Sequence, residues 1–95
     1  MRATYIVHGF VQGVGYRAYV KGIAEQLKLG GVAMNQEDGS VLIIVDGEET
    51  TLKKFEEGID ISIKYGMQVQ SIEKHFDADM NVDSDIDFSR FQILA

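Results

Sequence analysis

Residues 4–17 read TYIVHGFVQGVGYR, a run typical of a β-strand that leads through closely spaced glycines into a helical pattern. The β-branched and aromatic residues of Thr4–Val11 predict a first strand, and the glycines at 9, 13 and 15 predict a turn after it. Apolar residues then recur at 16, 20, 23, 24 and 27, which predicts a helix from about Tyr16 to Leu29. Gly30 and Gly31 are expected to end this helix. The stretch is therefore a strand–turn–helix unit.

The middle of the chain continues this alternation. Val32–Asn35 and Val41–Val45 are predicted as two strands joined by a hairpin turn at Asp38-Gly39. Residues 48–50 supply acidic and capping residues for a second helix. Its apolar spacing extends to Ile63, and Gly66 follows as the stop.

The last two strands are expected over Met67–Phe76 and around Phe88, Phe91 and Ile93. The order βαββαβ, plus a short C-terminal strand, predicts an α+β ferredoxin-like sandwich, an antiparallel sheet with two helices on one face. Residues 1–95 are expected to form one domain. The aromatic residues within these patterns are expected in the core: Tyr5, Phe10, Phe55, Phe76, Phe88 and Phe91. Because this topology carries many functions, function has to be inferred from the site.

Composition excludes several classes of function. The 95 residues contain no cysteine, which rules out disulfides, thiolate catalysis and cysteine-ligated metals. The net charge of -6 argues against binding to duplex nucleic acid. Much of that charge comes from one acidic segment, with aspartates at 77, 79, 83, 85 and 87. No apolar run approaches the roughly 20 residues that cross a bilayer, and no signal peptide is apparent, so a cytoplasmic location is expected.

The glycine turn before the first helix has the features of an anion site. Glycines let the backbone approach a ligand closely, and the free N–H groups of a helix N-terminus favour negative charge. Arg17 lies in the first helical turn, where a cation is unfavourable unless an anion binds beside it. A guanidinium can hold two phosphate oxygens at once. Glycine spacing alone is explained equally well by an ordinary tight turn with a solvated arginine.

Two motifs resemble the signatures of the acylphosphatase family. The first is Val7-x-Gly9-x-Val11-Gln12-Gly13-Val14-x-Tyr16-Arg17. The second is Gly31-Val32-Ala33-Met34-Asn35, three residues, Gly39, one residue, Val41, five residues and Gly47. The resemblance extends to the closing Phe91-Gln92-Ile93. Val32 departs from it, since the family usually has an aromatic residue there, and Tyr16 stands where Phe or Met is more frequent.

The resemblance implies hydrolysis of a carboxylic–phosphoric mixed anhydride to a carboxylate and inorganic phosphate. It implies that backbone amides cradle the phosphate, here those of Gln12, Gly13, Val14, Gly15 and Tyr16. It further implies that Arg17 binds the phosphate oxygens and that Asn35 orients the attacking water. Without the second motif, Asn35 would be interpreted as a hairpin residue. No metal or cofactor is expected. The expected partners are an acyl phosphate substrate and inorganic phosphate, for a monomer that binds neither nucleic acid nor membrane.

Other interpretations stay open at this point. A binding protein could keep the phosphate cradle without turnover. An RNA-binding module on the same topology is disfavoured, because residues 41–45 contain no aromatic residue. Acylphosphatase-like domains also occur in larger hydrogenase-maturation proteins, but no zinc-finger or carbamoyl-transfer region is visible here.

Two other features of the sequence resemble metal ligands but are interpreted as surface or structural residues. Asp77-x-Asp79-x-Asn81 resembles the start of a calcium loop, yet Val82 and Phe88 stand where that loop needs Gly and Glu. A solvated acidic hairpin between the last two strands is the favoured interpretation. His8 and His75 have no ligand set at a regular spacing and are expected to be structural or surface residues.

Overall fold

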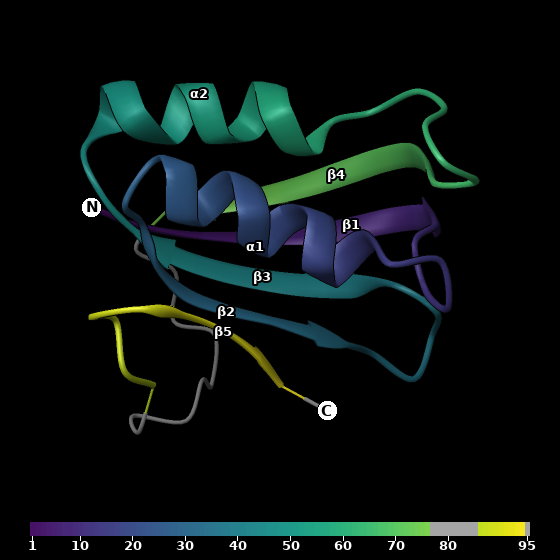
Figure 1. The fold of residues 1–95 in the computed structure, drawn as a ribbon, viewed down its shortest axis with the longest axis horizontal. Helices are drawn as coiled ribbons and strands as arrows, with labels where there is room; N and C mark the ends of the chain where they lie inside the picture. The colour runs from purple at the N-terminus through teal and green to yellow at the C-terminus, as the bar shows by residue number, and fades with distance from the viewer. Residues whose placement is uncertain (77–85, 95) are drawn as a thin grey trace.

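The computed structural model describes residues 1–76 and 86–94, and it contains two helices packed on one face of a five-stranded sheet (Figure 1). The elements are β1 (Arg2–Phe10), α1 (Tyr16–Gln26), β2 (Gly30–Asn35), β3 (Val41–Asp46), α2 (Glu49–Ile59), β4 (Gln68–Phe76) and β5 (Phe91–Leu94). The predicted ferredoxin-like sandwich is confirmed. Neither helix is long and apolar enough to span a membrane, as far as the described residues go.

The strand order across the sheet is β4-β1-β3-β2-β5. β1 runs antiparallel to both β3 and β4, and β2 runs antiparallel to β3. β5 pairs with β2 in parallel, so the sheet is mixed rather than purely antiparallel as predicted. The reason is topological: the chain leaves β4 at one edge and returns at the opposite edge, where it runs in the direction of β2. β4 and β5 are therefore not neighbours in the sheet. The predicted acidic hairpin and its calcium-like motif fall on residues 77–85, which lie outside the described residues.

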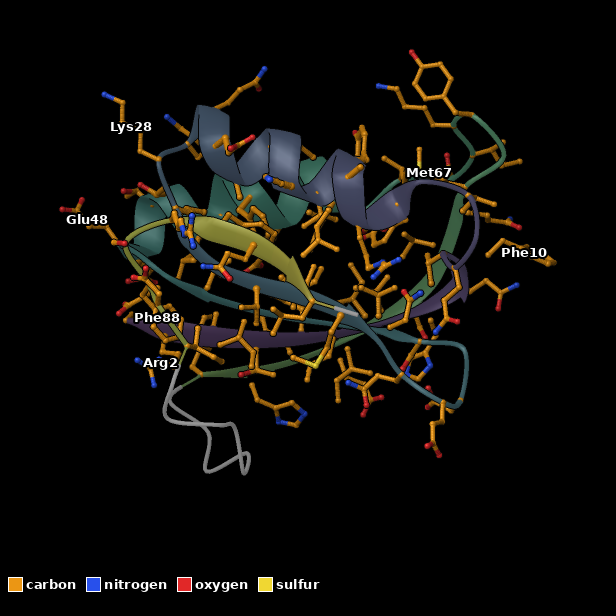
Figure 2. The ribbon with its side chains drawn as sticks, turned by 60° about the horizontal axis from the view of Figure 1, so that its bottom comes forward. Arg2, Phe10, Lys28, Glu48, Met67 and Phe88 are labelled. Atoms are coloured by element: carbon orange, nitrogen blue, oxygen red, sulfur yellow. The ribbon has the colours of Figure 1, made fainter. Side chains whose placement is uncertain are left out.

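The core lies between the sheet and the helices. Tyr5 and Val7 of β1 meet Val20 of α1 and Phe55 of α2 there, all with no exposed surface. The aromatic prediction is correct for Tyr5, Phe55 and Phe91. It is wrong for Phe10 and Phe76, which lie at the ends of their strands and are 65% and 43% exposed. Phe10 projects from the loop end of the molecule (Figure 2).

Phe88, the remaining aromatic residue of that prediction, is half-buried, and the Arg2 guanidinium lies 4.1 Å above its ring (Figure 2). It precedes β5 instead of belonging to it, because β5 begins at Phe91.

Both helices end earlier than their apolar spacing predicts. α1 ends at Gln26, and Lys28 takes the left-handed conformation (φ 59°) while the Leu29 amide donates to the Ala24 carbonyl at 2.8 Å. Gly30 and Gly31 therefore do not stop the helix; they begin β2. α2 ends at Ile59, so Ile63 is off the helix and 76% exposed. Gly66 lies beyond it, in the turn between Lys64 and Met67.

Candidate functional site

The segment between β1 and α1, residues 11–15, is here called the glycine loop. Its first residue, Val11, is buried in the core, which anchors the loop to the sheet. Gly13 and Gly15 have φ angles of 73° and 84°, a conformation that other residues adopt only at a cost. A Cβ atom added at either position would meet nothing within 4 Å. These glycines are thus required by the backbone conformation, and the loop surface beside them is open to a ligand.

The backbone amides of residues 12–16 are the main donors of this loop. Within residues 1–76 and 86–94, none of them donates to a backbone carbonyl. Gly15 is the N-cap of α1 and offers no side-chain cap, and the first turn of the helix contains no acidic residue. The positive end of the helix dipole is therefore unopposed at the loop. Free amides at a helix N-terminus form a binding site for an anion.

Arg17 brings the cationic side chain to this site. It is half-buried, and its Nη1 donates to the carbonyl oxygen of Leu94 in β5 at 2.9 Å. A guanidinium has five N–H donors in a planar fork, so this single bond leaves donors for a second acceptor. No pattern in the sequence indicates this contact, because it joins residues that are 77 positions apart.

A cavity of about 150 Å³ lies at the loop and is lined by Gly13, Gly15, Tyr16 and Arg17. Val11, Ala18 and Ile93 form its apolar side. Its volume is below the range of pockets for drug-sized ligands. The cavity thus fits a small anion, with apolar surface available for an attached group. The sequence also did not indicate that Ile93 lines it.

Asn35 lies at the end of β2, opposite Val41 of β3, which is in turn opposite Val7 of β1. Residues in one such row share a face of the sheet, and Val7 belongs to the core under the helices, so Asn35 also faces the helix side. Asn35 is not among the residues that line the cavity in the described chain. It lies one inward-facing position beyond Ala33, the partner of Ile93.

The Oδ1 atom of Asn35 is buried and has no hydrogen-bond partner among the described residues. A buried acceptor without a partner costs about 1–3 kcal/mol. Such a group is best explained by a donor that binds there, and a water molecule can supply one.

Tyr16 fixes the start of α1. Its hydroxyl donates to the carbonyl of Ile59 at the end of α2 at 2.8 Å, and it is fully buried. Burial, with a smaller contribution from the charge of Asp60, raises the pKa of Tyr16 far above its ordinary value. The Tyr16 hydroxyl is therefore neutral and structural, and only its backbone amide belongs to the predicted cradle.

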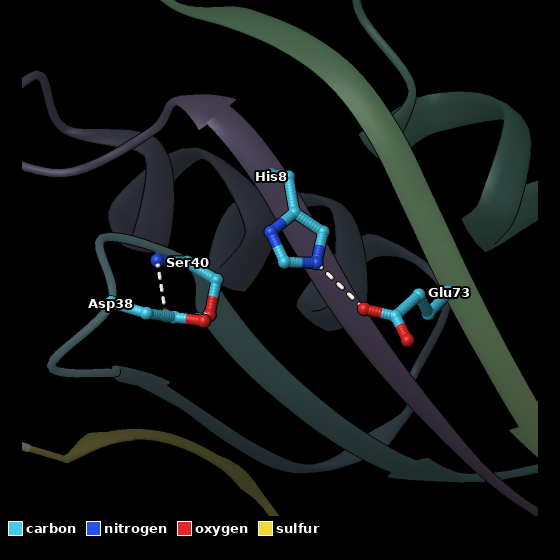
Figure 3. Close-up of polar contacts among 4 residues, drawn as sticks. All are labelled: His8, Asp38, Ser40 and Glu73. Carbon is cyan, nitrogen blue, oxygen red and sulfur yellow. Dashed lines mark hydrogen bonds and ion pairs between the residues drawn. The ribbon is translucent and has the colours of Figure 1, made fainter.

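The two histidines lie away from this site. His8 is on the sheet face opposite the helices, with its Nε2 atom 2.7 Å from Glu73 Oε2 (Figure 3). His75 is exposed on β4. Among the described residues, no three His, Asp or Glu side chains gather closely enough to hold a metal ion.

Comparison with known proteins identifies the family. The acylphosphatase family model matches residues 3–93. An acylphosphatase of Lactobacillus gasseri is 39% identical over 93 residues, covering 96% of this chain and 94% of the relative. An acylphosphatase of Clostridium perfringens is 47% identical over 55 residues, a stretch that covers 58% of this chain and only 62% of the relative.

Solved structures agree with this result. The acylphosphatase of Bacillus subtilis superimposes with a TM-score of 0.82 at 31% identity, covering 99% of this chain and 98% of that one. The loop with free amides, the adjacent arginine and these matches lead to one conclusion: the chain belongs to the acylphosphatase family.

Proposed function

We propose that this protein hydrolyses acyl phosphates to a carboxylate and inorganic phosphate without a metal ion. One observation carries the proposal. The amides of residues 12–16 donate to no backbone carbonyl of the described residues, and Gly13, Gly15, Tyr16 and Arg17 line one cavity at the N-terminus of α1. Membership of the acylphosphatase family supports the same activity.

In the proposed mechanism the phosphate dianion of the substrate lies in the glycine loop. The amides of residues 12–16 and the Arg17 guanidinium donate to its oxygens. Phosphoryl transfer depends mostly on positioning and on stabilising the charge of the transition state. Arg17 and the loop amides can provide both, because they are donors held by the backbone at the edge of one small cavity.

Asn35 would hold the attacking water. The water donates a hydrogen bond to Asn35 Oδ1 and attacks phosphorus, a new P–O bond forms, and the bond between phosphorus and the acyl oxygen breaks. The electron pair leaves with the carboxylate, a good leaving group that needs no general acid. The proton of the water passes to a phosphate oxygen. The unpartnered Oδ1 supports this role for Asn35, because an amide oxygen accepts hydrogen bonds without ionising.

The contact between Arg17 and Leu94 suggests what the substrate does on binding. A neutral carbonyl is a weaker acceptor than a phosphate oxygen, which forms charge-assisted bonds about twice as strong. We propose that Arg17 keeps its bond to Leu94 with one nitrogen and turns its remaining donors to the phosphate. β5 would then orient the arginine before the substrate arrives.

The remaining expectations are part of the same proposal. They are a single domain over residues 1–95, a monomer that acts in the cytoplasm, and no binding to nucleic acid. The absence of cysteine is compatible with a reducing compartment.

The proposal is tested by measuring phosphate release from benzoyl phosphate in excess chelator. We expect turnover by the wild type and a loss of roughly a thousandfold in kcat/KM for Arg17→Ala and for Asn35→Ala, the range found when a transition-state donor is removed. Arg90→Ala is the matched control, because Arg90 is an exposed arginine whose guanidinium is near Asp87 and not in the cavity. Full activity in both site variants would refute the site. A wild type that binds phosphate without turnover would indicate the non-catalytic alternative.

A further inference from the structure

Gln12 connects the glycine loop to the hairpin that follows Asn35. Its side-chain Nε2 donates to the carbonyl oxygen of Gln36 at 2.7 Å and to that of Ser40 at 2.8 Å. Both N–H groups of the amide are thus used by two carbonyls far from Gln12 in the sequence. The side chain is half-buried, which shields these bonds from water.

The two carbonyls belong to the ends of one turn, residues 36–40, here called the hairpin turn. Gln36 directly follows Asn35, and Ser40 directly precedes Val41, the partner of Asn35 in the sheet. The Gln36 amide also donates to the Ser40 carbonyl at 2.8 Å. Gln12 therefore binds both residues that flank the Asn35–Val41 pair.

This link connects two segments on either side of β3. The glycine loop follows β1 and Asn35 ends β2, and β3 lies between these two strands. The glycine loop and Asn35 are thus attached to strands that do not pair with each other. Misplacement by about 1 Å can cost a factor of about 100 in rate, so their relative position has to be fixed by a contact that spans β3.

We propose that the Gln12 side chain is a positioning residue that sets Asn35 relative to the phosphate bound in the glycine loop. The inference rests on the proposed function of Arg17 and Asn35 and deepens it. The role is separate from that of the Gln12 backbone amide, which remains in the cradle. A donor is required here, because both partners are carbonyl oxygens and neither can donate.

The test is Gln12→Met, which keeps the length of the side chain and removes both donors. We expect kcat for benzoyl phosphate to fall by roughly 10- to 100-fold, while KM and inhibition by inorganic phosphate change less than about threefold, because the amides and Arg17 remain. Asp38→Asn is the matched control. Asp38 accepts from the Ser40 amide and hydroxyl within the same turn and does not contact the glycine loop. It should leave kcat within about twofold of the wild type.

A double-mutant cycle separates positioning from a general loss of structure. If Gln12 acts through Asn35, Gln12→Met added to Asn35→Ala should reduce the remaining kcat by less than about twofold. An equal loss in both backgrounds would overturn the inference, as would an unchanged kcat in the single variant. Thermal unfolding of each variant shows whether it is folded under the assay conditions.

A second readout does not depend on turnover. In the wild type, added inorganic phosphate should shift the NMR signals of the loop amides and of the Asn35 side-chain amide. In Gln12→Met the loop signals should still shift, and the Asn35 side-chain shift should fall to less than half. Equal Asn35 shifts in both proteins would refute the coupling. If the wild type lacked turnover, the proposed function would fail, and the NMR comparison would still decide the coupling.

Discussion

The glycine loop and the hairpin turn both depend on glycine, but they differ in whether their backbone amides are hydrogen-bonded within the protein. Both contain glycines with positive φ, 73° and 84° in the loop and 94° at Gly39 in the turn, and a Cβ at any of them would meet nothing within 4 Å. In the turn, the Gln36 amide donates to Ser40, the Gly39 amide to Gln36 and the Ser40 amide to the Asp38 carboxylate. In the loop, the amides of residues 12–16 have no backbone acceptor within the part of the chain that is described.

The difference shows what distinguishes a binding loop from a connection. Glycine supplies the same backbone freedom to both segments, so its presence does not identify a ligand site. The turn uses the amides of Gln36, Gly39 and Ser40 in its own hydrogen bonds, so these amides are not available to an anion. Backbone amides that stay unpaired at a helix N-terminus raise the free energy of the folded protein, and an anion that accepts their hydrogen bonds removes this cost.

The largest expected difference between the two segments is the loss of activity when one glycine of each is replaced by alanine. Gly13→Ala and Gly39→Ala each place a side chain at positive φ, and each should lower the free energy of unfolding by about 1 kcal/mol. Gly13→Ala should also reduce kcat/KM roughly a hundredfold, because it reorients amides of the cradle, whereas Gly39→Ala should change it less than about twofold. Phosphate release and urea unfolding check both values. Equal losses of activity would mean that the glycine loop has no special role.

Inorganic phosphate should stabilise the folded protein through the glycine loop. At about ten times its Kd the expected gain is about 1.4 kcal/mol, equivalent to a Tm increase of roughly 5–10 °C for a chain of this length. Gly39→Ala should retain this increase and Arg17→Ala should lose most of it. Thermal unfolding with sodium chloride at matched ionic strength is the control. If phosphate raised the Tm of Arg17→Ala as much as that of the wild type, phosphate would bind at a site other than the glycine loop.

The smallest expected effect is a pH-dependent change in stability that comes from Asp38 in the hairpin turn. Hydrogen bonds from the hydroxyl and amide of Ser40 hold the pKa of Asp38 below its ordinary value of 3.8. A carboxyl group with a lowered folded-state pKa stabilises the fold above its unfolded-state pKa, and that contribution is lost as the pH falls through the folded-state value. Asp38→Asn should therefore be slightly less stable than the wild type at pH 7, and this gap should close below about pH 4. Urea unfolding at pH 7 and pH 3 measures the gap; a gap of constant size would contradict the assignment.

Most of the fold was predictable from the sequence, because it depends on local patterns. β-branched and aromatic residues marked β1, a continuous apolar run marked β3, and the Asp38-Gly39 pair marked the hairpin turn. Features set by distant contacts were not predictable. Lys28, not a glycine, takes the left-handed position after α1, and no local pattern reports that β5 pairs in parallel with β2.

In the candidate site, too, the features marked by local sequence were predictable and the contacts between distant segments were not. The motifs located the glycine loop, Arg17 and Asn35, since each is marked by residues close to it in sequence. The sequence did not show the Arg17–Leu94 bond, the place of Ile93 in the cavity or the two bonds of the Gln12 side chain. These contacts join segments that meet only after the sheet has formed, so their partners carry no recognisable spacing.

The strand order has a consequence for synthesis of the protein. β1 is made first, yet it lies inside the sheet, and its partner β4 is made much later, with Ala3 opposite Phe76. One edge of an apolar strand therefore stays unpaired until residue 76 has left the ribosome, and unpaired strand edges are templates for aggregation. Pairing over such sequence separations is also slow. The proposed phosphate cradle, attached to the end of β1, thus rests on a strand that is fully paired only after β4 has been made.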